Sequence, residues 1–102
     1  MPKRNEPASP PIHETRVADL ITTLATLRDP DLTRRFLRDL CTRVELEALA
    51  QRWEVAQLVD QGVSYSQIAQ RTGASTATVT RVAQWLHHGE NGYADVLRKA
   101  RK

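Results

Sequence analysis

The sequence has very little cysteine: Cys41 is the only one among 102 residues. A single thiol cannot form a disulfide within the chain or a cysteine-based metal site. No run approaches the roughly 18 consecutive apolar residues of a membrane span, and residues 1–11 lack the apolar stretch of a signal peptide. We therefore expect a cytoplasmic protein with no metal site and no membrane association.

A catalytic arrangement is also missing from the sequence. A nucleophile, a base and an orienting acid would have to be taken from residues that are needed for helix capping or packing. The neighbouring His87 and His88 would point about 100° apart on a helix, so they are poorly placed to share a metal ion. We therefore expect no enzyme activity.

Acidic residues are absent from one long stretch of the chain. The formal net charge is only +3, but no acidic residue lies between Asp60 and Glu90. The arginines and histidines in that stretch are Arg71, Arg81, His87 and His88. A polyanion would be attracted to such a segment. An ordinary solvated surface carries similar charges, so charge alone leaves both interpretations open.

The first dozen residues contain four of the five prolines. We expect residues 1–12 to form a disordered tail, followed by one domain over residues 13–102. A first helix is predicted over about residues 13–28 by apolar residues at helical spacing, which are Val17, Leu20, Ile21, Leu24 and Leu27.

Two further helices are predicted by their capping residues. Asp29 suits the N-cap of a second helix, with Pro30 in its first turn. Thr42 and Glu45 have the spacing of a capping box and open a third helix that can continue to about residue 61. The third helix is apolar on two sides, so we expect it to be buried on two sides.

Two short helices joined by a glycine turn follow. Ser64 and Gln67 have capping-box spacing, and Gly73 ends the helix that they open. Ser75 is a natural N-cap for a further helix that ends near Gly89. This arrangement predicts a helix-turn-helix over about residues 64–88.

The residues where the two helices would cross meet the steric demands of a helix-turn-helix. Ala69 is small at the crossing, and Gly73 permits the sharp reversal that often needs a positive φ. Val79 and Val82 would point from the second helix toward Ile68 of the first. The alternative is an ordinary helical hairpin with a fortuitous glycine.

The outward side of the second helix would suit a DNA groove. Its residues are Thr76, Ala77, Thr78, Thr80, Arg81 and Gln84. Arg81 and Gln84 can make bidentate contacts to guanine and adenine, and the threonine and alanine methyl groups can meet thymine methyls. Ser75 and Gln67, near the two helix starts, are placed to hold phosphate. Double-stranded DNA is the predicted partner. The alternative is an adaptor that binds a protein, which an apolar patch on this helix would favour.

Two longer stretches resemble the Trp repressor superfamily, most closely its YerC/YecD or TrpR-related branch. They are Cys41–Arg52, with the sequence CTRVELEALAQR, and Gly73–Arg81, with the sequence GASTATVTR. The resemblance extends over about residues 31–97. It implies an all-α, six-helix subunit in an intertwined homodimer, with a last short helix near residues 93–101. It also implies a sequence-specific transcriptional regulator, which we expect to be a repressor acting at a near-palindromic site.

The resemblance also identifies candidate effector-binding residues. In the Trp repressor, two arginines hold tryptophan between the third helix and the helix-turn-helix. The matching positions are Arg52 and Arg81, with Thr42 at the start of the third helix. The repressor has glycine directly after the second arginine, whereas this chain has Val82, which would crowd a flat ring. We therefore do not expect L-tryptophan as the effector and predict no cofactor.

Two roles are open for these arginines. They could hold an unknown anionic ligand. Alternatively, Arg52 pairs with Glu47 or Glu54, and Arg81 serves DNA alone.

Overall fold

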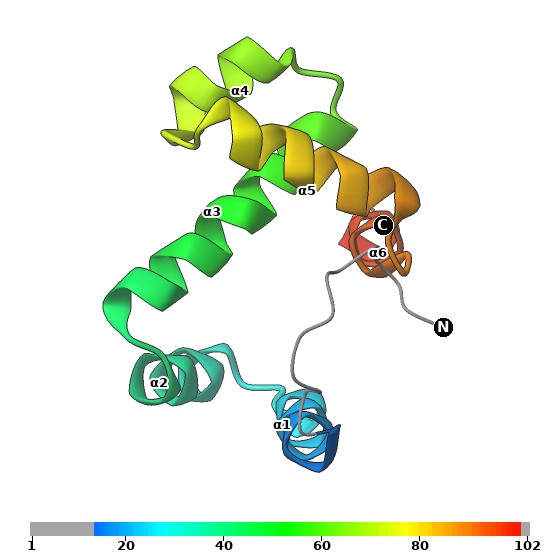
Figure 1. The fold of residues 1–102 in the computed structure, drawn as a ribbon. Coiled ribbons are helices and arrows are strands. Elements are labelled where there is room, and N and C mark those ends of the chain that lie inside the picture. The colour runs from blue at the N-terminus through cyan, green and yellow to red at the C-terminus, as the bar shows by residue number, and fades with distance from the viewer. Residues whose placement is uncertain (1–13, 101–102) are drawn as a thin grey trace. The chain divides into compact units, whose positions relative to one another are not determined.

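The computed structural model describes residues 14–100, and this part of the chain is entirely helical apart from turns (Figure 1). Its six helices are α1 (Glu14–Thr26), α2 (Pro30–Leu40), α3 (Arg43–Asp60), α4 (Tyr65–Thr72), α5 (Thr76–His88) and α6 (Gly92–Ala100). The expected all-α, six-helix subunit is confirmed. The expected tail, residues 1–12, lies outside the described residues.

The described residues form two compact units, residues 14–46 and residues 47–100. The first unit holds α1, α2 and the first turn of α3. The second holds the rest of α3 together with α4, α5 and α6. None of the helices between residues 14 and 100 has both the length and the apolar character that crossing a membrane would require.

The helix starts in the first unit follow the capping rules. The Asp29 carboxylate accepts the backbone N–H of Asp31 at 3.1 Å, and Pro30 occupies the first helical position of α2. At the start of α3, the Thr42 N–H donates to the Glu45 carboxylate at 2.8 Å. The Glu45 N–H donates in return to the Thr42 hydroxyl at 3.1 Å. The predicted capping box is therefore complete.

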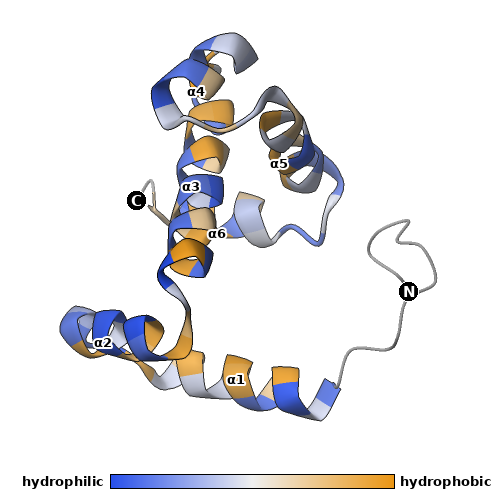
Figure 2. Cartoon of the chain, turned by 60° about the vertical axis from the view of Figure 1, so that its left-hand side comes forward, coloured by the Kyte–Doolittle hydropathy of each residue, from blue (hydrophilic) through white to orange (hydrophobic). Residues whose placement is uncertain are grey.

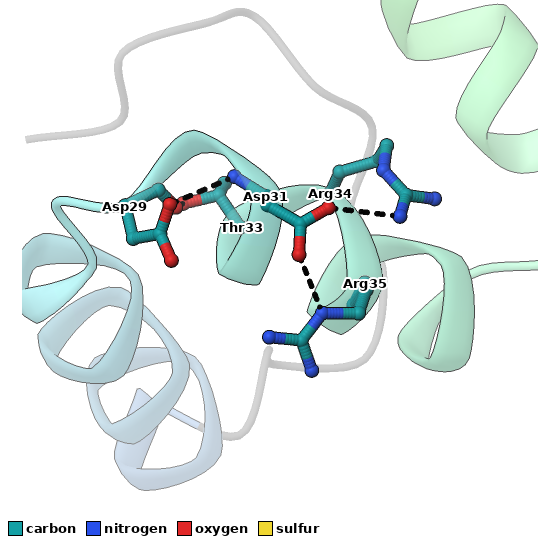
Figure 3. A network of polar contacts seen from close by, with 5 residues as sticks. All are labelled: Asp29, Asp31, Thr33, Arg34 and Arg35. Atoms are coloured by element: carbon teal, nitrogen blue, oxygen red, sulfur yellow. Dashed lines mark hydrogen bonds and ion pairs between the residues drawn. The ribbon is translucent and has the colours of Figure 1, made fainter.

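A polar network surrounds the first turn of α2 (Figure 3). The Asp31 carboxylate accepts hydrogen bonds from Arg35 at 2.9 Å and from Arg34 at 3.0 Å. The hydrogen bond from Arg35 and, to a smaller extent, the one from Arg34 lower the pKa of Asp31 below its usual 3.8. All three side chains are exposed, so water weakens these ion pairs and they contribute modestly to stability. The charges of Arg34 and Arg35 are thereby paired with the Asp31 carboxylate.

Helices α1 and α2 leave several of their apolar residues exposed and the others only half-buried. Neither helix contains a buried residue, and hydrophobic positions recur along the ribbon of α1 (Figure 2). The large apolar side chains exposed in this unit are Val17, Ile21, Leu32, Leu40 and Val44. Helices of 13 and 11 residues are marginal in water without tertiary packing. These two helices therefore need a further surface to cover them.

Burial of α3 differs from the expected two-sided pattern. Its second half is buried at Val55, Ala56 and Leu58, but Leu49 in its first half is 45% exposed. The difference arises because the second half of α3 packs in the core cluster with α4 and α5.

The second unit is built around one apolar cluster. The cluster contains Val55, Ala56, Leu58, Ile68, Ala74, Val79 and Val82. The largest fully buried side chains are Val55, Ile68, Val79 and Val82, and each such burial stabilises the fold by about 1.5–3 kcal/mol. Tyr93 of α6 stacks on Trp53 of α3, with ring centroids 6.4 Å apart. The cluster and the stack hold α4, α5 and α6 to α3.

The connection from α5 to α6 requires glycine at residue 89. The Gly89 N–H donates to the Trp85 carbonyl at 2.9 Å and ends α5. A Cβ built on Gly89 would lie 2.5 Å from that carbonyl oxygen, which is well inside van der Waals contact. Because the clashing atom belongs to the backbone, a side chain here would force the helix end to shift.

We therefore expect Gly89→Ala to lower the free energy of unfolding by about 1–3 kcal/mol. Gly92→Ala is the control, because nothing lies within 4 Å of its Cβ position, and we expect it to leave stability nearly unchanged. Urea unfolding followed by circular dichroism measures both variants. Equal stability of the two proteins would show that the close approach at Gly89 is unimportant.

Candidate nucleic-acid interface

Helix α4 begins at the predicted Ser64 N-cap and ends at the predicted Gly73, although the return bond from the Gln67 side chain that completes a capping box is not among the hydrogen bonds of residues 14–100. The Ser64 hydroxyl accepts the N–H of Gln67 at 3.3 Å, so Ser64 is the N-cap. At the other end, Gly73 has φ 77, in the left-handed region that disfavours side chains, and its N–H donates to the Ala69 carbonyl at 2.9 Å. The predicted reversal at Gly73 is present.

The turn between α4 and α5 comprises residues 73–75 and is held by the Thr72 side chain. The Thr72 hydroxyl donates to the Ile68 carbonyl at 2.8 Å and accepts the Ala74 N–H at 3.1 Å. Ala74 is itself buried in the core cluster. The turn is thus anchored by hydrogen bonds on α4 and by apolar packing beneath it. Helices α4 and α5 are two separate helices that lie against each other (Figure 1).

Ser75 is the N-cap of α5. Its hydroxyl accepts the Thr78 N–H at 3.1 Å and also lies 3.1 Å from the Thr78 hydroxyl. Thr78 is half-buried, so its hydroxyl takes part in the cap as well as standing near the predicted face. Of the predicted DNA-contacting residues, Thr78 is therefore the least accessible.

The two sides of α5 are clearly different. Its buried residues are Val79, Val82, Ala83 and Leu86. Its exposed residues near the N-terminus and middle are Thr76, Ala77, Thr80, Arg81 and Gln84. The large apolar side chains exposed between residues 14 and 100 all lie on other helices. The exposed side of α5 is therefore polar, with one guanidinium group.

The positive charges on α4 and α5 have no acidic residue beside them in the sequence of these helices. Helices α4 and α5 contain no acidic residue, and within residues 14–100 no ion pair holds the Arg81 side chain. Ser64 and Ser75 begin the two helices, whose first N–H groups carry partial positive charge. An anion can therefore bind at either helix start. The Arg81 side chain is exposed on the same helix as the second of these starts. The exposed Gln67 lies in the first turn of α4.

The candidate effector-binding residues lie on α3 and α5. Arg52 is exposed on α3 and Arg81 is exposed on α5. Pairing of Arg52 with Glu47 or Glu54 stays a prediction. Thr42 caps α3 in the first unit. Val82, directly after Arg81, is only 1% exposed and belongs to the core cluster.

Comparison with known proteins identifies relatives that match most of the chain. A family model described as Trp repressor protein matches residues 15–101. The uncharacterized protein YerC of Bacillus subtilis is 40% identical over 83 residues, covering 81% of this chain and 80% of that protein.

Two solved structures are similar in both fold and sequence. One, from Staphylococcus aureus and described as a candidate Trp repressor, has a TM-score of 0.81 and 36% identity, covering 85% of this chain and 87% of that chain. The other, a TrpR-like protein from Eubacterium eligens, has a TM-score of 0.80 and 38% identity, covering 84% of this chain and 89% of that chain.

The N-cap of α5 gives a prediction that needs no ligand. Ser75→Ala removes the oxygen that accepts the Thr78 N–H, so we expect the free energy of unfolding to fall by about 0.5–2 kcal/mol. Ser66→Ala is the matched control, because Ser66 is exposed inside α4, and its effect should stay within about 0.5 kcal/mol. Thermal unfolding measures both. A Ser75→Ala protein as stable as the control would mean that the cap contributes nothing.

Proposed function

The chain belongs to the Trp repressor family, and from this we propose that it is a sequence-specific, DNA-binding regulator of transcription that acts as a repressor. In this proposal, α4 and α5 form a helix-turn-helix over about residues 64–88, and α5 enters the major groove. The functional domain is residues 13–102, it has no catalytic activity, and it acts on DNA in the cytoplasm.

The observation that carries the proposal is the division of α5 into two sides. Its apolar residues are in the core, while its exposed side is polar and bears Arg81. A face that bound a partner protein would be expected to expose a contiguous apolar patch. The large exposed apolar residues of the described chain are on other helices. The polar face therefore favours DNA over the adaptor alternative.

The roles of the individual residues follow from their positions. Arg81 and Gln84 are proposed to contact base edges, because both side chains are exposed on α5 and can make bidentate hydrogen bonds. The exposed Thr76, Ala77 and Thr80 supply methyl groups to thymines and hydroxyls to the backbone. Ser75 and Gln67 are proposed to bind phosphates near the starts of α5 and α4. Thr78 is proposed to act through the Ser75 cap, with its remaining exposed surface toward the duplex.

A second copy of this chain is the proposed cover for α1 and α2. No residue of these helices is buried, and Ile21 is 59% exposed. Intertwining two chains would bury such faces, and it would also present two copies of α5 to successive major grooves about 34 Å apart. The preferred site should accordingly be nearly palindromic.

We also propose that DNA binding requires no small-molecule effector. Val82 occupies the core with Val79 and Ile68 and is 1% exposed. A flat ring inserted beside Arg81 would have to displace this valine from a packed cluster, which is costly. Arg81 is thus left to the duplex.

The DNA-binding function is tested first by selecting bound duplexes from a random pool. For the selected site, Arg81→Ala should weaken binding by about 1–3 kcal/mol and relax the choice of base at one position. Arg81→Lys keeps the charge but loses bidentate geometry, so it should retain binding to a scrambled duplex while losing part of the preference. Fluorescence anisotropy at several salt concentrations measures these affinities.

Two results would contradict this assignment. If Arg81→Ala weakened binding to the selected and the scrambled duplex equally, Arg81 would not read bases. If affinity did not fall with salt, phosphate contacts would be absent, since their counterion release makes DNA binding strongly salt-dependent.

The proposed dimer is tested at Ile21. Ile21→Asp should weaken self-association by about 10- to 100-fold, because it replaces a large apolar side chain that the dimer would bury with a carboxylate. Thr22→Asp adds the same charge on the exposed neighbouring residue and serves as the control. Sedimentation equilibrium at micromolar concentration should give a dimer for the wild type. A monomeric wild-type protein would rule out the dimer.

Independence from an effector is tested by adding L-tryptophan to the DNA-binding assay. The affinity for the selected duplex should change by less than the roughly fivefold that marks the lower end of allosteric coupling. Repeating the random-pool selection with a mixture of amino acids extends the test to other ligands. A selection that succeeded only with an added amino acid would contradict the proposal.

A further inference from the structure

Gln51 of α3 hydrogen-bonds the end of α4. Its side-chain nitrogen Nε2 donates to the Thr72 carbonyl oxygen at 3.2 Å, across 21 positions of sequence and in a half-buried setting. Thr72 is the last residue of α4, so its carbonyl belongs to the last turn, where carbonyls have no partner within the helix. The bond thus gives this carbonyl a partner and links two helices.

The same nitrogen also lies beside Gly73. Outside residues 72–74, it is the nearest atom to the position that a Cβ on Gly73 would take, at 4.0 Å. Gly73 is where the chain reverses with φ 77, and α5 begins three residues later, at Thr76. Gln51 therefore contacts the turn at the point that determines the direction in which α5 leaves α4.

Two kinds of interaction hold α5 in place, and only one of them is directional. The apolar cluster of Ile68, Val79 and Val82 fixes which side of α5 is buried, but apolar contact is not directional. A hydrogen bond constrains both distance and angle. The Thr72 hydroxyl organises the turn from within α4, whereas Gln51 is a constraint supplied from α3, the helix on which the unit is built.

We propose that Gln51 is a positioning residue that fixes the orientation of α5 on α3. Its consequence for DNA rests on the proposed function, since base recognition requires side chains to be held within about 0.5 Å and 10–20° of the productive geometry. Loss of the bond should leave the core intact while widening the range of orientations of α5. Contacts that need exact placement, such as those of Arg81, would then suffer more than contacts to phosphate.

The test replaces Gln51 with methionine, which has similar length and no N–H donor. The matched control is Gln57→Met, because Gln57 is also half-buried on α3 but donates to the Trp53 carbonyl within its own helix, at 3.4 Å. Hydrogen exchange of the Gly73 and Ala74 amides is measured on the protein alone. Affinity is then measured for the selected duplex and for a scrambled one.

The expected result is specific to Gln51→Met. The Gly73 and Ala74 amides should exchange about fivefold faster, and the preference for the selected duplex should fall by a similar factor, while affinity for the scrambled duplex is unchanged. Gln57→Met should resemble the wild type in both measurements, and the melting temperatures of the two variants should be similar.

Three outcomes would overturn the proposal. Unchanged exchange in Gln51→Met would mean that the bond does not hold the turn. Faster exchange with an unchanged duplex preference would mean that the bond does not orient α5. A loss of stability far larger than in Gln57→Met would indicate a general structural role. If the wild type bound no duplex, the proposed function would fail, and the exchange measurement would still decide whether Gln51 holds the turn.

Discussion

The apolar contact among Val55, Ile68 and Val79 is the interaction on which the rest of the second unit depends. It joins one residue each from α3, α4 and α5, and all three side chains are completely buried. Because Val79 must face inward for this contact to form, the helical period turns Thr80 and Arg81 outward. The polar face of α5 is therefore a geometric consequence of how its apolar side packs.

Local signals in the sequence were sufficient to predict the first five helices and approximately where they end. The Thr42–Glu45 capping box, the Ser75 cap and the reversal at Gly73 all depend on residues within a few positions of each other. The same holds for the inward position of Val79 and Val82. Family resemblance added the expectation of six helices, which the structure also has.

Features that depend on long-range contacts were not predictable in this way. Nothing in the neighbourhood of Gln51 indicates that it bonds Thr72, because the two are 21 residues apart. The half-burial of Thr78 and the exposure of Leu49 likewise depend on which elements cover them. Periodicity identifies an apolar face, but it does not say whether another part of the same subunit covers it. For this reason the sequence alone suggested that both apolar sides of α3 would be buried.

The separation of the two sides of α5 also bears on how such proteins could diversify. Thr76, Ala77, Thr80 and Gln84 are exposed and take no part in the core cluster, and substitutions at such surface positions usually change stability by less than about 0.5 kcal/mol. Under the proposed function these same positions face the bases. New target preferences could therefore arise by mutation at little thermodynamic cost to folding, so regulators that share this scaffold would be able to acquire different sets of binding sites.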